Sequence, residues 1–133
     1  MARLGITDAF ARYGATLRNP QWSVSAWAPD GSLVVSIWEH HYRKGPPETM
    51  EFADSLARWS GHGNREFRAN LARAHAVGSR LRLVLVRASN TAAVDAGEDA
   101  SKIPKEFFVR VDLVGAVQEL DGDRFVLRFR RLS

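Results

Sequence analysis

The stretch that most constrains the fold is residues 22–38, which read WSVSAWAPDGSLVVSIW. On either side of its centre, apolar residues alternate with small, polar or aromatic ones, and this period of two predicts a pair of β-strands. The segment APDGS separates the two runs: its proline presets φ, its aspartate can bond to its own backbone, and its glycine accepts a positive φ. The pattern therefore predicts a hairpin, and this hairpin carries three of the four tryptophans.

The two faces of this hairpin have different expected roles. Trp27 and Trp38 alternate with the residues that we expect to build the core, which are Val24, Ala26, Val35 and Ile37. The two indoles would then be partly exposed, and an exposed indole beside an arginine can stack on a nucleobase while the guanidinium contacts phosphate. The alternative is that both faces are buried, one by the sheet interior and one by helices.

The remaining elements follow from apolar spacing and turn residues. Spacing of three and four residues predicts helices over 6–13, capped by Thr7, over 50–59, and over 64–77, which Asn64 would cap and Gly78 would end. Alternation predicts strands over 81–86, 107–113 and 125–129, with Asp121-Gly122 as the turn before the last strand. Polar loops are expected over 39–49 and over 89–102, and the second loop is long enough to serve as a lid.

This order of elements predicts an α+β fold. We expect a mixed, mostly antiparallel sheet, curled or closed into a small barrel, with helices packed on it. A chain of 133 residues fits one domain, so residues 1–133 are expected to form a single domain. The absence of a signal-peptide pattern and of an apolar run long enough for a membrane span predicts a cytoplasmic protein without a membrane partner.

Charge is distributed unevenly along the chain. The net charge is +4, but residues 58–87 hold seven arginines against a single acid, Glu66. Such segregation could form a positive face for phosphate groups, although a solvated surface or a compositional bias toward arginine would give the same count.

Motifs for catalysis and cofactor binding are scarce. Cysteine is absent, which excludes disulfides, thiolate metal sites and a cysteine nucleophile. His40 and His41 follow Glu39 and offer possible metal ligands, but consecutive residues of a strand point to opposite faces, so we expect neither a metal site nor a cofactor. Gly61-His62-Gly63 is either an anion-binding site at the N-terminus of a helix or a flexible segment at which the helix begins.

Three segments together resemble a known family. They are GATLRNPQWS with the following DG at 14–31, VSIWE at 35–39 and GNREF at 63–67. The set resembles the opening of a bacterial domain found alone or joined to HNH-type nucleases in restriction-like proteins. The architecture is similar to PUA-like barrels, the superfamily of the EVE, ASCH and SRA modules, which hold modified or flipped bases in an aromatic pocket.

The resemblance implies a set of site residues. The implied pocket residues are Trp22, Ser23, Trp38 and Glu39, with Asn64 and Arg65 at its rim. The sequence lacks the HNH histidine-asparagine-histidine pattern, so the resemblance implies a reader whose cleavage activity, if any, belongs to a separate nuclease subunit.

The leading hypothesis is a non-catalytic domain that binds DNA or RNA through one base, modified or not. Trp22, Trp27 and Trp38 would stack on the base, Ser23 and Glu39 would bond to it, and the expected phosphate contacts are Arg65, Arg68 and Arg82. One alternative is a small metal-dependent nuclease or hydrolase that uses Glu39, His40 and His41. The other is a protein-interaction module that docks a partner on an exposed apolar patch.

Overall fold

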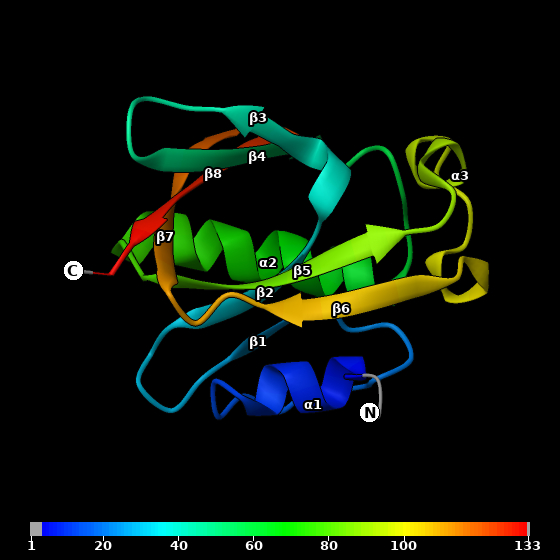
Figure 1. The fold of residues 1–133 in the computed structure, drawn as a ribbon, viewed down its shortest axis with the longest axis horizontal. Coiled ribbons are helices and arrows are strands. Elements are labelled where there is room, and N and C mark those ends of the chain that lie inside the picture. Colours follow the sequence, from blue (N-terminus) through cyan, green and yellow to red (C-terminus); the bar gives the residue numbers. More distant parts are fainter. Residues whose placement is uncertain (1–3, 133) are drawn as a thin grey trace.

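The computed structural model of the protein describes residues 4–132 (Figure 1). Within that range the chain forms eight strands and three α-helices, with two short 3₁₀ turns. The helices are α1 (Ile6–Ala11), α2 (His62–Val77) and α3 (Thr91–Asp95), and the 3₁₀ turns are η1 (Glu39–His41) and η2 (Ala100–Lys102). The strands are β1 (Ser25–Trp27), β2 (Leu33–Trp38), β3 (Tyr42–Lys44), β4 (Thr49–Ser55), β5 (Leu81–Ala88), β6 (Lys105–Val109), β7 (Leu113–Asp121) and β8 (Arg124–Arg131).

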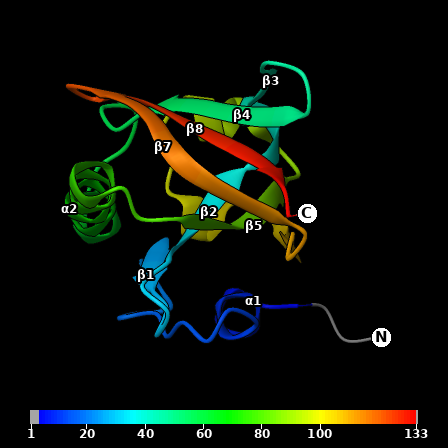
Figure 2. The same ribbon diagram turned by 90° about the vertical axis from the view of Figure 1, so that its left-hand side faces the viewer.

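The strands form one mixed sheet in the order β1-β2-β5-β7-β8-β4-β3, and β6 pairs with β5 beside this path. The β2–β5 pair is parallel, and the other pairs among the described residues are antiparallel. The sheet curls, so that β7, β8 and β4 lie over the β2–β5 pair (Figure 2). The expected α+β class, with a mostly antiparallel curled sheet flanked by helices, is confirmed, and the sheet is open because its path ends at β1 and β3.

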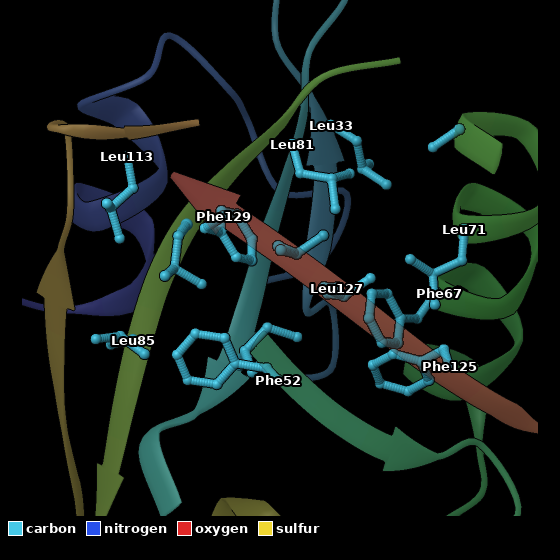
Figure 3. Close-up of a cluster of buried hydrophobic side chains, with 14 of the residues drawn as sticks. Leu33, Phe52, Phe67, Leu71, Leu81, Leu85, Leu113, Phe125, Leu127 and Phe129 are labelled. Carbon is cyan, nitrogen blue, oxygen red and sulfur yellow. The ribbon is translucent and has the colours of Figure 1, made fainter. Parts of the chain in front are cut away.

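The main core lies inside this curl, closed on one side by α2. Phe67 and Leu71 of α2 point toward the side chains of β8 (Figure 3), and the ring of Phe67 meets that of Phe125 edge to face at 5.6 Å. Phe129 and Phe52 are fully or almost fully buried and make a second such contact at 6.0 Å. Burial of apolar side chains such as these rings is the dominant favourable term in folding.

A second cluster of buried residues lies on the other face of the sheet. α1 buries Ala9 and Phe10 against Ala26, Val34 and Val84 of strands β1, β2 and β5. The central strands β2 and β5 are therefore covered on both faces, which is why their sequences are almost continuously apolar.

The hairpin of β1 and β2 is confirmed, but the expected assignment of its faces is wrong. Its turn places Gly31 at φ +88° and lets Asp30 Oδ1 accept from the backbone N–H of Ser32 at 2.9 Å. The resulting register pairs Trp27 with Leu33 and Ala26 with Val34. Directly paired residues share a face, so Trp27 lies on the same face as Leu33, which is part of the main core. Successive residues of a strand alternate between faces, so Trp38 lies on the opposite face from Leu33.

Several other local predictions are also corrected. Residues 50–59 form strand β4 and a turn instead of a helix, the loop over 39–49 contains η1 and β3, and the loop over 89–102 contains α3 and η2. The strand over 107–113 is broken by a turn at residues 110–112 that separates β6 from β7. Thr7 does not cap α1, whose N-cap is Gly5, and Asn64 does not cap α2, whose N-cap is Gly61.

The predicted end of α2 is correct, since Gly78 takes the left-handed conformation there with φ +68°. Among the described residues, no helix has the length and apolar character needed to cross a membrane.

Candidate functional site

A groove of about 720 Å³ lies between α2, β1 and the segment that leads into β1. From α2 it is lined by side chains spaced three and four residues apart, which places them on one face of the helix. The lining consists of Thr16, Arg18, Trp22, Ser25, Ala26, Trp27, His62, Arg65, Glu66, Ala69 and Asn70. Two indoles and two guanidiniums therefore share one concave surface.

Trp27 forms the fixed wall of this groove. Its Nε1 donates to Oδ1 of Asn70 at 3.0 Å, and Nδ2 of Asn70 donates to Oγ of Ser25 at 2.9 Å. The guanidinium of Arg73 lies 4.9 Å from the centre of an indole ring, a cation–π contact. Because both its polar atom and its ring are engaged, Trp27 holds one orientation.

Trp22 stands at the N-terminal end of α2 and is half-buried. Its ring lies 5.5 Å from that of His62 at an interplanar angle of 41°, and Arg65 Nη2 donates to His62 Nδ1 at 2.7 Å. Gly63 lets the first turn of α2 lie close to the backbone of Trp22, because a Cβ atom at this position would lie 2.1 Å from the carbonyl oxygen of Trp22. The indole therefore has a defined neighbour on one side, while its Nε1 has no hydrogen-bond partner among residues 4–132.

Glu66 adds an acceptor to the groove. Its Oε1 is buried and has no hydrogen-bond partner among the described residues. A buried carboxylate oxygen without a donor is costly, so this side chain gains if it turns toward a donor in the groove that Glu66 lines. With Arg18, Arg65 and the nearby Arg73, the groove still carries more positive than negative charge.

Two of the implied pocket residues are structural. Ser23 is buried, and its Oγ accepts from the backbone N–H of Asn19 at 3.1 Å. Asn64 is buried as well, and its Nδ2 donates to the carbonyl oxygen of Leu56 at 2.8 Å, fixing α2 to the turn after β4. Neither polar group faces the groove, so the structure gives both residues a role in positioning the chain.

Trp38 and Glu39 lie outside the groove. Trp38 packs against a small cluster formed by Ala93, Val94 and Ile103. Both oxygens of Glu39 accept from Arg87, at 2.9 and 3.1 Å, and this hydrogen-bonded pair lowers the pKa of Glu39. The expectation that these two residues join Trp22 and Trp27 in one pocket is wrong, because Trp38 lies on the opposite face of the sheet from Trp27 and Glu39 begins the turn η1 after β2.

The expected phosphate contacts Arg68 and Arg82 are also separate from the groove. Arg68 Nη1 donates to Asp123 at 2.6 Å. Arg82 Nη2 donates to the carbonyl oxygen of Val111 at 2.8 Å, and its guanidinium covers the ring of Tyr13 at 4.8 Å, on the α1 side of the sheet. Of the nine residues expected to form the site, Trp22, Trp27 and Arg65 line the groove together.

The residues that sequence reasoning missed are Arg18, Glu66 and Asn70. Helical spacing of Glu66, Asn70 and Arg73 was a usable signal, since it places three polar side chains on one face of α2. Arg18 carried no such signal, because its place in the groove depends on the path of residues 12–24.

A second group of functional side chains lies at the ends of β2 and β5. Nε2 of His40 and Nε2 of His41 lie 2.9 and 2.8 Å from Oδ1 of Asp95, and the two rings are 4.2 Å apart. These hydrogen bonds, that of His41 first, lower the pKa of Asp95. The expectation that the histidines diverge is wrong, because residues 39–41 form a 3₁₀ turn and not a strand.

No family model, curated protein or solved structure matches this chain. What the protein binds must therefore be inferred from the chemistry of its own groove and clusters.

Proposed function

We propose that this chain is a nucleic-acid-binding domain that receives one base, modified or unmodified, in the groove between α2 and β1. The observation that carries the proposal is that Trp22, Trp27, Arg65 and Arg18 line one groove together with the carboxylate residue Glu66. A base has a flat face, N–H groups at its edge and a phosphate on either side. The groove supplies a counterpart for each of these three features.

Each groove residue has a distinct role in the proposal. Trp22 stacks on the base, because Trp27 is already engaged by Asn70 and Arg73. Glu66 accepts from an amino or imino group at the edge of the base. Arg18 and Arg65 contact the flanking phosphates. In this proposal the domain is a non-catalytic reader, and any cleavage would come from a separate nuclease subunit.

The resemblance to PUA-like modules forms part of the same proposal. The curled, mostly antiparallel sheet with packed helices supports it, whereas the open ends at β1 and β3 differ from a closed barrel. In this groove, Trp22 and Arg65 keep the roles that the resemblance implies. Glu66 takes the place of Ser23 and Glu39 as the residue that forms hydrogen bonds to the base.

The test is fluorescence polarisation with labelled single-stranded and duplex DNA and single-stranded RNA, each with cytosine or 5-methylcytosine. Loss of one stacked base is worth about 1–3 kcal/mol, so Trp22→Ala should weaken binding about 5- to 150-fold. Two phosphate contacts predict that log K falls with log[salt] with a slope of about −1.4 on single strands. Arg65→Ala should bring that slope to about −0.7.

The matched controls are Trp38→Phe and Arg87→Ala, since neither residue lines the groove. Both controls should retain the parent affinity. Absence of binding at low salt, or equal losses in Trp22→Ala and Trp38→Phe, would overturn the proposal. If Trp22→Ala instead disrupted capture of a protein partner and left nucleic-acid affinity unchanged, the interaction-module alternative would replace it.

A further inference from the structure

His40, His41 and Asp95, here called the His–Asp cluster, come together because β2 and β5 are parallel neighbours. Parallel strands end at the same edge of a sheet, and side chains that follow such ends commonly form sites. Residues 39–41 directly follow β2, and α3, which carries Asp95, begins three residues after β5 ends. Two segments about fifty residues apart in sequence therefore meet at one edge.

The donor atoms of the cluster converge on a single point. The two Nε2 atoms both contact Oδ1 of Asp95, and the three donor atoms lie within 4.8 Å of one another. In a tetrahedral site with bonds of about 2.0–2.2 Å, donor atoms are roughly 3.3–3.6 Å apart. The side chain of Asp95 is 54% exposed, so it can withdraw by the few tenths of an ångström that an ion needs.

A carboxylate also lies beside the second ring nitrogen of His41. Its Nδ1 is buried and has no hydrogen-bond partner among the described residues, and the nearest carboxylate oxygen, Oδ2 of Asp54, lies 3.4 Å away. A metal-binding histidine usually donates its second ring N–H to such a carboxylate, so Asp54 is placed to take this role after a small approach. Arg58 holds Asp54 through bonds of 2.9 and 2.7 Å, and its Nη1 also donates to the carbonyl oxygen of Val94 at 2.7 Å. Arg58 therefore fixes Asp54 and the helix that carries Asp95 at once.

From this geometry we propose that the His–Asp cluster binds one divalent transition-metal ion of the zinc class. Two imidazole nitrogens and one carboxylate oxygen suit such ions, whereas Mg²⁺ and Ca²⁺ prefer oxygen ligands alone. Three protein ligands leave at least one position open to water, and the exposed side of Asp95 gives access to it. Residues of this cluster do not line the α2–β1 groove, so the two sites can be tested separately.

The competing explanation is that Asp95 serves as a hydrogen-bond acceptor that ties α3 to η1. The substitution Asp95→Asn separates the two explanations, since an amide oxygen still accepts from the histidines but is a poor metal ligand. His40→Ala/His41→Ala removes both imidazoles. His75→Ala is the matched control, because His75 is exposed on α2 and outside the cluster.

The experiment is calorimetric titration of the untagged, chelator-treated chain with ZnCl₂, supported by metal analysis after dialysis and by the absorption spectrum with Co²⁺. We expect one Zn²⁺ per chain, an unchanged affinity in His75→Ala, and losses above about 100-fold in Asp95→Asn and the double variant, since even outer-sphere changes cost about 10- to 100-fold. Circular dichroism verifies that each variant is folded. No bound zinc in the parent chain, or full binding in either cluster variant, would overturn the proposal.

Discussion

Replacing Gly63 by alanine tests how closely α2 approaches Trp22. The new Cβ would lie 2.1 Å from the carbonyl oxygen of Trp22, 3.1 Å from its carbonyl carbon and 3.6 Å from the ring of Trp59. Non-bonded heavy atoms normally remain about 3.5 Å apart, so the two backbones must separate by more than about 1 Å. A rotamer change cannot relieve this contact, because a backbone oxygen and a Cβ atom have no side-chain freedom.

Two opposing effects decide how much Gly63→Ala changes the free energy of unfolding. Alanine favours a helix over glycine by up to about 1 kcal/mol, whereas overpacking of a well-packed contact costs about 1–3 kcal/mol. Because the contact here is with backbone, we expect the upper part of that cost and a net destabilisation of about 1–2 kcal/mol. For a chain of this length, that corresponds to a decrease in melting temperature of about 3–10 °C.

Urea titration and thermal melts of Gly63→Ala measure this effect, with Gly5→Ala as the matched control. Gly5 has φ −84°, and no atom lies within 4 Å of its hypothetical Cβ. A weaker helix cap and a less flexible unfolded chain roughly cancel there, so we expect a change within about 0.5 kcal/mol. A Gly63→Ala variant that melts at or above the parent temperature would refute the close approach of α2 to Trp22.

Two further predictions concern stability. Glu51 is buried between Arg43 and Arg128; burial alone would raise its pKa, but the guanidiniums lower it below the usual value. Because the folded state has the lower pKa, this carboxylate stabilises the fold above about pH 4.3 and ceases to do so as pH falls through its folded pKa. In urea titrations at several pH values, the free energy of unfolding should fall less at acid pH in Glu51→Gln than in the parent chain. The same pH dependence of stability in both proteins would contradict the ion pairs. Phe129→Ala, at a fully buried site, should cost about 3–5 kcal/mol in the same assay, whereas Leu132→Ala, at a half-exposed site, should cost under about 0.5 kcal/mol.

Local turn chemistry made part of the fold predictable. The Asp-Gly pairs at 30–31 and 121–122 specify their hairpins within a few residues, and both glycines have positive φ. Residues 50–59 were misassigned because Phe52 and Leu56 are buried at a helical spacing although a strand and a turn carry them. Sequence patterns cannot show that β8 will pair with β4, and that pairing decides the conformation of this segment.

The candidate site was predictable to the extent that it depends on local sequence. Trp22, Trp27 and Arg65 were found because aromatic and basic residues are visible in the sequence itself. The position of Trp38 was missed because burial of β2 on both faces removes the alternation that would distinguish its sides. The convergence of His40 and His41 is not predictable from the sequence, because a 3₁₀ turn of three residues leaves no periodic signal.

The late pairing of β4 has a consequence for synthesis on the ribosome. Thr49 pairs with Arg130, so β4 emerges about eighty residues before the strand that completes one of its edges. Until then β4 can pair with β3 alone, and Phe52 lacks the aromatic partner that β8 brings. Nascent chains that stall before β8 is synthesised should therefore expose an unpaired strand edge that can pair with other chains, and they should need chaperones more than the complete chain does.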